Sequence, residues 1–227
     1  MKYIVVGLGN FGSALAEKLT NAGNEVIGVD SILSRVEALK TKATHVIALD
    51  CTDITAINAL PIYEADCVIV AIREDFGASI LITAMFKQLK VKRLISRAMS
   101  PLHQTVLEAI GVDEIVHPEE ESAARLTEVL SLAGAIDVYS LFDKHKVVEV
   151  KLPARYCGMK VIDTDIRHKY HLNILTVIKT VERKGLIGSV KKRQEVLDYM
   201  DPATVLHPDD IIVLFGRSSD IRTFLND

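Results

Sequence analysis

A glycine-rich turn near the start of the chain has the residue types and spacing that hold the phosphates of a nucleotide. The apolar residues 3–6 lead into Gly-Leu-Gly-Asn-Phe-Gly at positions 7–12, and helical spacing follows from residue 13 to residue 19. A Gly-x-Gly-x-x-Gly pattern between a strand and a helix is the dinucleotide-binding fingerprint. We expect Gly7 to permit the tight turn, Gly9 to let the backbone approach a pyrophosphate, and Gly12 to let the helix pack on the strand. The phosphates would meet the N–H groups and the positive dipole end of this helix.

An acidic residue at the end of the next predicted strand, residues 25–30, is the second candidate for ligand binding. Asp30 has about the spacing from the glycines at which an acid accepts hydrogen bonds from the hydroxyls of a ribose. The alternative is that Asp30 only caps the helix that follows. No arginine comes directly after Asp30, which disfavours a nucleotide with a 2′-phosphate, so NADP is not expected.

The elements that must position these residues alternate along the first part of the chain. Helical segments are expected at residues 34–42, 54–60, 78–89 and 102–110, and strands at residues 45–49, 67–72, 93–96 and 114–116. Continuous apolar strands between helices indicate a parallel sheet that is covered on both faces. We therefore predict an α/β fold in which residues 1–135 form a Rossmann-like, doubly wound nucleotide-binding domain.

A different pattern begins near residues 133–140, after a helix expected at residues 119–132. Alternating apolar and polar residues at 147–152 indicate a strand of an antiparallel sheet. The other elements expected here are a helix at 163–170, a strand at 173–179, a turn at Lys184–Gly185, a strand at 211–215 and a helix through Leu225. We predict a small α+β domain at residues 136–227.

Composition and charge exclude several classes of protein. Of the 227 residues 49% are hydrophobic, which provides ample material for a core, and 27 Lys and Arg against 30 Asp and Glu form no basic stripe. A nucleic-acid partner is therefore not expected. The longest apolar stretches fall far short of the roughly 20 residues that cross a bilayer, so we expect a soluble, cytoplasmic protein. Three isolated cysteines, Cys51, Cys67 and Cys157, fit a reducing compartment and are interpreted as packing residues.

Taken together, these segments resemble the regulator of potassium conductance (RCK) family, in particular the single-copy cytoplasmic gating subunits of Ktr/Trk-type potassium uptake systems. The resemblance covers nearly the entire chain and is carried by residues 4–12, 29–30, 68–72, 106–113, 115–119, 162–170, 207–210 and 216–221. It implies a homo-oligomer, a dimer-built octameric ring, beneath a membrane potassium-translocating subunit. It also implies that exchange of a bound nucleotide, ATP/ADP or NAD(H), gates potassium flux by changing the shape of the ring.

The resemblance implies a set of residues around the nucleotide. These residues are Gly7, Gly9, Asn10, Phe11, Gly12, Asp30, Asp50, Cys51, Thr52, Ala71, Arg97 and Glu119. Ktr-like relatives carry an arginine where this chain has Asn10, so both ATP/ADP and NAD(H) remain open. Arg97 would contact phosphate, or it is an exposed surface arginine. Glu119 would help to hold Mg²⁺ or another cation, or it is an acid that stabilises the N-terminus of the next helix.

The second domain has a further ligand site in some relatives, which bind cyclic di-AMP between two copies. The matching residues here are Val161, Ile162, Asp165 and Arg167. Arg167 would hold a phosphate and the apolar pair would pack against a base. The alternative is an ordinary core edge with charges at a helix end.

Two other classes of function compete with a potassium-transport regulator. An NAD-dependent oxidoreductase needs a positioned acid or base, and the spacing from Tyr156 to Lys160 matches a dehydrogenase pair, but Gly158 interrupts the required helix. A redox-sensing, nucleotide-binding regulator of transcription would need a basic recognition helix, which the sequence lacks. His168 and His171 have no third metal ligand nearby and are interpreted as surface residues. We therefore predict a regulator without enzymatic activity.

Overall fold

The chain forms two compact units in a computed structural model that describes residues 1–142, 144–184 and 190–227. The first unit is Met1–Glu120 and the second is Glu121–Asp227. The division falls earlier than the expected boundary at residue 135, near the start of helix α6, Pro118–Leu130. The later part of α6 associates with the second unit, because Val129 packs against its core and Glu128 pairs with Lys146 at 2.9 Å.

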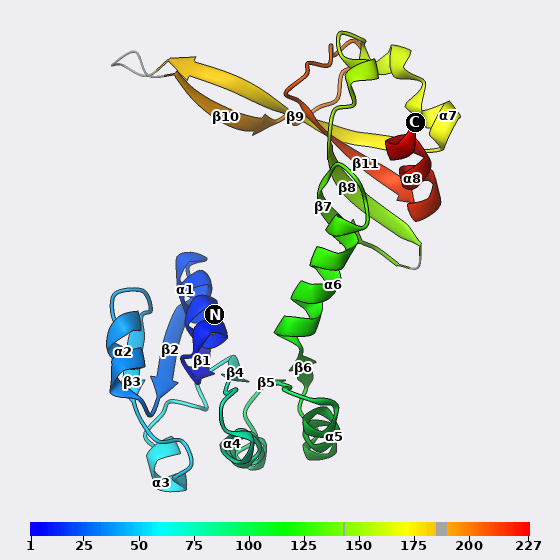
Figure 1. Cartoon of the computed structure of the whole chain (residues 1–227). Coiled ribbons are helices and arrows are strands. Elements are labelled where there is room, and N and C mark those ends of the chain that lie inside the picture. Colours follow the sequence, from blue (N-terminus) through cyan, green and yellow to red (C-terminus); the bar gives the residue numbers. More distant parts are fainter. Residues whose placement is uncertain (143, 185–189) are drawn as a thin grey trace. The chain divides into compact units, whose positions relative to one another are not determined.

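The first unit alternates strands and helices, as predicted (Figure 1). Its elements are β1 Lys2–Val6, α1 Asn10–Asn21, β2 Glu25–Asp30, α2 Leu33–Leu39, β3 His45–Ala48, α3 Ile54–Ile57, β4 Cys67–Val70, α4 Phe76–Gln88, β5 Leu94–Arg97, α5 Pro101–Ile110 and β6 Glu114–Val116. All six strands pair in parallel in the order β3-β2-β1-β4-β5-β6. This is the strand order of a Rossmann fold, and the predicted α/β class is confirmed.

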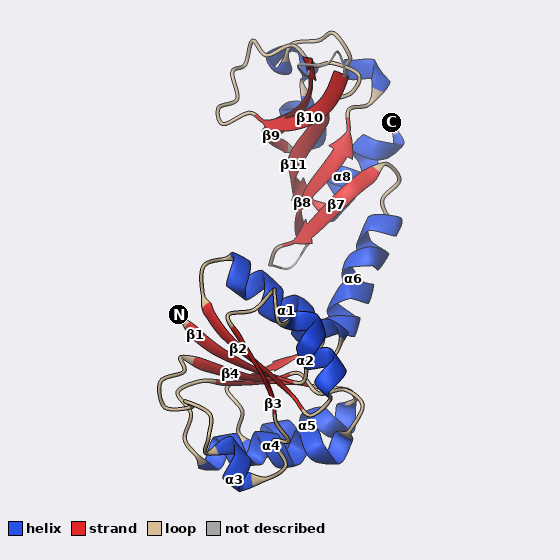
Figure 2. Cartoon of the chain, turned by 90° about the vertical axis from the view of Figure 1, so that its left-hand side faces the viewer, coloured by secondary structure: helices blue, strands red, loops and turns tan. Residues whose placement is uncertain are grey.

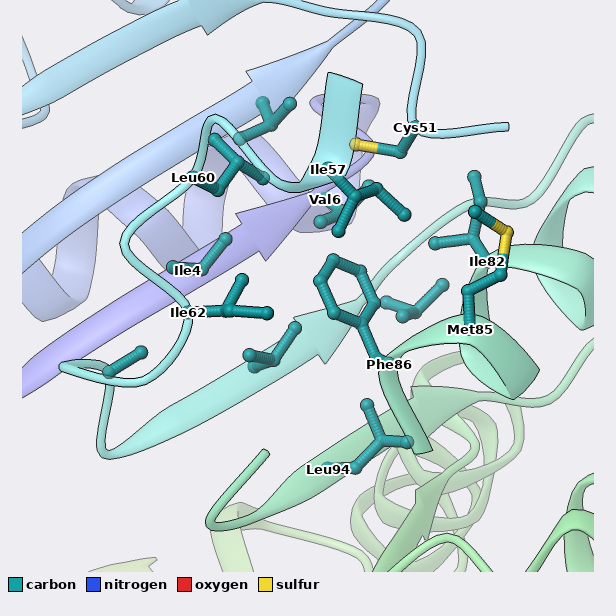
Figure 3. Packing of buried hydrophobic residues seen from close by; sticks show 14 of the residues in the cluster. Ile4, Val6, Cys51, Ile57, Leu60, Ile62, Ile82, Met85, Phe86 and Leu94 are labelled. Atoms are coloured by element: carbon teal, nitrogen blue, oxygen red, sulfur yellow. The ribbon is translucent and has the colours of Figure 1, made fainter. Parts of the chain in front are cut away.

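Two hydrophobic layers cover the parallel sheet, and consecutive residues of one strand face opposite layers. Ile4 and Val6 of β1 belong to the cluster that contains Phe86 of α4, whereas Val5 belongs to the cluster that contains Ala16 of α1. Figure 2 shows α1 and α2 on one face of the sheet and α3, α4 and α5 on the other. In Figure 3 the ring of Phe86 lies among aliphatic side chains of the strands and of α3. The continuous apolar strands of the sequence are therefore explained by burial on both faces.

The strand order reverses between β1 and β4, which are neighbours in the sheet although they are distant in sequence. The chain passes from β1 to β2 and β3 on one side and returns to β4 on the other. Ligands of open α/β sheets bind outside the carboxyl ends of the strands at such a switch point. A ligand site is therefore expected at the turns that follow β1, β2 and β4.

The second unit contains an antiparallel sheet in the order β10-β9-β11-β8-β7 among the described residues. Its elements are β7 Ala135–Ser140, β8 His145–Lys151, 3-10 helices at Ala154–Tyr156 and Val161–Thr164, α7 Ile166–Tyr170, β9 Asn173–Lys184, β10 Val190–Val196, β11 Ile211–Arg217 and α8 Ser218–Asn226. Val148 and Val150 of β8 are fully buried and alternate with half-buried residues. One face of the sheet therefore packs on a core that includes Phe224 of α8.

Three features of the second unit differ from the sequence prediction. Strand β7 was not predicted, because its polar residues, such as Asp137, interrupt the apolar alternation. Strand β10 has the sequence Val-Lys-Lys-Arg-Gln-Glu-Val, and charged residues hid it. Strand β9 extends through Lys184, past the expected end at residue 179, and the turn predicted at Gly185 lies outside the described residues.

Candidate nucleotide-binding site

The glycine turn lies between the end of β1 and the start of α1, at the switch point of the sheet. Gly7 has a φ of +93°, and a Cβ there would lie 2.9 Å from the backbone nitrogen of Ile72. A Cβ on Gly12 would lie 1.9 Å from the carbonyl oxygen of Gly7. In contrast, a Cβ on Gly9 would have no neighbour within 4 Å. Gly7 and Gly12 are thus required by the fold itself, whereas the space beside Gly9 is open.

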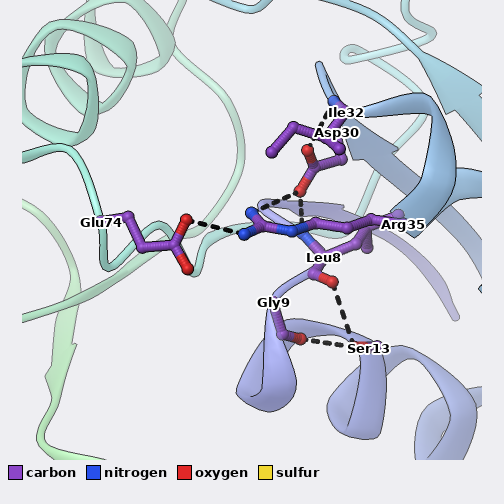
Figure 4. Close-up of polar contacts among 7 residues, drawn as sticks. All are labelled: Leu8, Gly9, Ser13, Asp30, Ile32, Arg35 and Glu74. Atoms are coloured by element: carbon purple, nitrogen blue, oxygen red, sulfur yellow. Dashed lines mark hydrogen bonds and ion pairs between the residues drawn. The ribbon is translucent and has the colours of Figure 1, made fainter.

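The N-terminus of α1 is built to receive an anion. Gly9 is the N-cap residue, and no side chain caps the helix or places an acid in its first turn. The hydroxyl of Ser13 donates to the carbonyl oxygens of Leu8 and Gly9, which holds the turn against the helix (Figure 4). The first N–H groups and the positive end of the helix dipole therefore lie at Gly9, where a phosphate can approach. These residues fit a nucleotide pyrophosphate.

Asp30 ends β2 and is buried, with its side chain 5% exposed. One carboxylate oxygen accepts the N–H of Leu8 at 2.6 Å, and the other accepts the N–H of Ile32 at 2.8 Å. Asp30 therefore fixes the glycine turn and the entry to α2 at the same time. Asp30 does not cap α2, because the N-cap residue is Ile32 and no side chain caps that helix. The bond to Leu8 places the carboxylate of Asp30 beside the fingerprint.

Arg97 is the last residue of β5 and is 5% exposed, so the alternative of a surface arginine is wrong. Its guanidinium pairs with Glu119 and lies over the ring of Phe11, 5.3 Å from the ring centroid. Glu119 also pairs with Arg73, with 3.7 Å between the carboxylate oxygen and Nε. The Nε of Arg97 is buried and has no hydrogen-bond partner in the structure. The structure thus brings Arg97, Glu119 and Phe11 together beside the first turn of α1.

The remaining predicted contacts follow β3 and β4. Asp50 and Thr52 are exposed in the turn after β3, where Asp50 accepts the Thr52 hydroxyl at 2.7 Å and its N–H at 2.9 Å. These hydrogen bonds lower the pKa of Asp50. The side chain of Cys51 points into the core (Figure 3), and burial raises its pKa to about 12. Ala71 follows β4, is buried, and donates its N–H to Val6 at 2.7 Å.

All residues of the predicted nucleotide set therefore lie at the carboxyl ends of parallel strands. This shared edge follows from the topology, because every strand of the sheet runs in the same direction. Asn10 is exposed at the start of α1, and Phe11 is partly buried. Their roles as ligand contacts remain predictions.

The sequence prediction did not include three charged residues near the site, which are Arg73, described above with Glu119, and the pair Arg35 and Glu74. Arg35 of α2 places a guanidinium nitrogen 3.6 Å from the Asp30 carboxylate and another 2.7 Å from the carboxylate of Glu74 (Figure 4). Glu74 lies in the loop between β4 and α4. Arg35 does not follow Asp30 directly but lies in the first turns of α2. An arginine therefore does lie beside Asp30, although its absence was the reason to disfavour a 2′-phosphate.

The four residues considered for a second ligand lie in the second unit. Val161 and Ile162 open a 3-10 helix; Val161 packs against the core, and Ile162 is 67% exposed. Asp165 adopts a left-handed conformation and contacts His168 at 2.9 Å. Arg167 is exposed in α7. Cyclic di-AMP binding by this group remains a prediction.

Clustered metal ligands and long apolar helices are both lacking among the described residues. Among them no group of three or more His, Cys, Asp or Glu side chains is arranged to hold a metal ion. In the same ranges, no helix combines the length and apolar character that a membrane span requires. A cation at Glu119 therefore stays a prediction. Such a cation would need ligands other than protein side chains, for example the phosphates of a nucleotide.

The fold and the site define a nucleotide-binding, Rossmann-like unit joined to an antiparallel α+β unit. Residues 3–118 match the model of the TrkA-N domain. The chain belongs to the TrkA-N family. It is 33% identical to Ktr system potassium uptake protein C of Bacillus subtilis (strain 168), over 98% of this chain and 95% of that protein. The predicted resemblance to Ktr/Trk-type proteins is confirmed.

Solved structures share this fold at low sequence identity. The RCK domain of GsuK matches 99% of this chain with a TM-score of 0.61 and 17% identity, and this chain covers 46% of that one. The GsuK channel bound to NAD matches 100% of the chain with a TM-score of 0.60 and 18% identity, and 39% of that chain is covered. These likenesses concern the fold. The similarity to the Ktr protein favours the predicted potassium-transport regulator over the oxidoreductase alternative.

Proposed function

We propose that this chain is the cytoplasmic nucleotide-binding subunit of a potassium uptake system and regulates a membrane potassium-translocating partner. The observation that carries this proposal is the similarity to a Ktr potassium uptake protein, which extends through both units of the chain. A shared Rossmann unit alone would fit many activities, because a fold does not fix a function. A match that continues through the second unit is more specific.

The nucleotide is the regulatory ligand in this proposal. The uncapped N-terminus of α1, the open approach at Gly9 and the carboxylate of Asp30 supply contacts for phosphate and ribose. A regulator changes shape only if its ligand binds two shapes with different affinity. ATP and ADP differ by one phosphate, and NAD⁺ and NADH differ by the charge of the nicotinamide ring, so either pair can supply the difference. GsuK has been solved with NAD, which supports including NAD(H).

Assembly and further ligands complete the proposal. Copies of the chain form a ring built from dimers, which transmits the change of shape to the partner. A cation would bind at Glu119 through Oε2, because both arginines pair with Oε1. Cyclic di-AMP would bind beside Ile162 and Arg167.

Calorimetric titration of nucleotide-stripped protein tests the ligand. ATP, ADP, NADH and NAD⁺ are titrated with and without Mg²⁺, while light scattering records the size of the particle. Binding of one of these pairs by a ring-sized particle is the expected result.

The role in transport is tested by potassium-limited growth of a bacterial strain that lacks its own Ktr and Trk systems and expresses this chain with a Ktr membrane subunit. Growth that is the same with and without the chain would refute a role in potassium uptake.

A further inference from the structure

Arg35 connects two acidic residues of the first unit, Asp30 at the end of β2 and Glu74 in the loop after β4. Its guanidinium lies 3.6 Å from the carboxylate of Asp30 and 2.7 Å from that of Glu74. The two acids have very different surroundings, since the Asp30 side chain is 5% exposed and the Glu74 side chain is 72% exposed. Arg35 itself is 30% exposed. The arginine thus has one buried and one solvent-exposed partner.

The pair formed by Arg35 and Glu74 crosses the carboxyl end of β1. Arg35 follows β2, Glu74 follows β4, and β1 lies between these strands in the sheet. One oxygen of Asp30 faces Arg35 and also accepts the N–H of Leu8, so the guanidinium lies beside the glycine turn. Figure 4 shows the side chain of Arg35 reaching toward Glu74, with Asp30 and Leu8 beside its guanidinium. The guanidinium therefore borders the place that the fold provides for a nucleotide.

We propose that Arg35 binds a phosphate of the nucleotide and that Glu74 competes with this phosphate for Arg35. A guanidinium presents paired N–H donors that fit a phosphate as well as a carboxylate. Asp30 is held by two backbone N–H groups and keeps its place. Glu74 is the replaceable partner, because an exposed ion pair contributes little stability. This inference rests on the proposed nucleotide binding and adds a residue that selects among nucleotides.

Removal of Glu74 alone does not test the idea, because any acid near the site repels phosphate. Competition for Arg35 has a more specific consequence: Glu74 weakens nucleotide binding only because it pairs with Arg35. The effect of Glu74→Gln must then vanish in a protein that already carries Arg35→Gln. Such a double-mutant cycle separates a shared partner from independent effects.

Calorimetric titration with ADP, NAD⁺, NADP⁺ and adenosine measures the cycle in the full chain. Glu74→Gln should tighten ADP binding about two- to fivefold, the range expected when an exposed ion pair no longer competes. Arg35→Gln should weaken it about tenfold, since a charge-assisted hydrogen bond is lost. The double variant should bind ADP like Arg35→Gln, and adenosine, which has no phosphate, should lose no affinity in any of the variants.

Comparison of the nucleotides also shows which of their phosphates contacts Arg35. A loss in Arg35→Gln that is shared by ADP and NADP⁺ supports contact with the 5′ phosphate chain, and a loss confined to NADP⁺ supports contact with a 2′-phosphate. Glu114→Gln is the matched control, because Glu114 pairs with Arg93 at the amino ends of β5 and β6, away from the site. It should bind every ligand like the unmodified protein.

Two results would overturn the inference while leaving nucleotide binding in place. One is a gain from Glu74→Gln that persists in the double variant, which would show general repulsion by an acid. The other is unchanged affinity in Arg35→Gln for every phosphate-bearing ligand. If the unmodified protein bound none of the ligands, both the proposed function and this inference would fail.

Discussion

Substitution of two neighbouring glycines should separate ligand binding from stability in the first unit. In Gly9→Val the new side chain extends into space where a Cβ has no neighbour within 4 Å. In Gly12→Ala the single added carbon would lie 1.9 Å from the carbonyl oxygen of Gly7 and 3.2 Å from the Cβ of Ala71. The first change should block the approach of a phosphate, and the second should disturb the fold.

The expected sizes of the two effects follow from these contacts. Gly9 has a φ of −67° and a ψ of −170°, which any residue can adopt, so Gly9→Val should cost at most about 1 kcal/mol through a poorer N-cap. Gly12→Ala forces backbone atoms apart, and overpacking of a well-packed site costs about 1–3 kcal/mol or more. Because the clashing atom belongs to the backbone, we expect about 3 kcal/mol or more for Gly12→Ala.

Chemical denaturation with and without nucleotide measures both quantities. A ligand at about 100 times its dissociation constant stabilises the unmodified protein by about 2.7 kcal/mol. Gly9→Val should unfold at nearly the same denaturant concentration as the unmodified protein without ligand and should gain nothing from it. Full ligand stabilisation of Gly9→Val would refute the role of this glycine, and unaltered stability of Gly12→Ala would refute the close-packing argument.

Three further predictions concern other parts of the molecule. Gly216→Ala should destabilise the second unit by about 1–3 kcal/mol, since its Cβ would lie 2.3 Å from Cδ2 of the fully buried Leu172; thermal unfolding measures this. Cys51 and Cys67 should resist iodoacetamide at pH 8 in the folded protein and react after unfolding, because burial raises their pKa values to about 12 and about 11; mass spectrometry of the labelled peptides detects any early reaction. Thr52→Ala should raise the pKa of Asp50 toward its ordinary value, as followed by NMR titration. The stabilisation that accompanies the lowered pKa is present above the ordinary value and is lost as the pH falls through the lowered one, so the variant should lose stability at neutral pH and little in strong acid.

The sequence predicted the glycine turn and the carboxyl edge of the parallel sheet well because their signals are local. The tight turn at Gly7 and the close contact at Gly12 are properties of one short segment, and the structure contains both. Asp30 could be placed because it ends a buried strand whose length the sequence reveals. Once the strands are parallel, their carboxyl ends share an edge, which brings Arg97 and Glu119 to the site from distant positions.

Features that depend on contacts between distant residues were not accessible in this way. The pairing of Arg35 with Glu74 joins a helix to a loop 39 residues further along, and neither position belongs to a recognisable motif. Burial of Arg97 was equally hidden, because an arginine at a strand end is usually exposed. Strand β10 is polar throughout its middle, so the backbone pairing with β9 that holds it in the sheet has no counterpart in the hydrophobic pattern.

The hydrogen bonds of Asp30 link recognition of ribose to the position of Arg35. A carboxylate offers about four acceptor positions, and two of those on Asp30 are taken by the N–H groups of Leu8 and Ile32. A third faces Arg35 across 3.6 Å, so an adjacent pair of ribose hydroxyls can bind both oxygens only if the guanidinium moves away from Asp30. The exposed pair with Glu74 then no longer has a fixed geometry, and the phosphate of the same nucleotide becomes the nearest alternative partner. Ribose binding to Asp30 and the exchange of Glu74 for phosphate at Arg35 should therefore occur together. One nucleotide would thus use both Asp30 and Arg35.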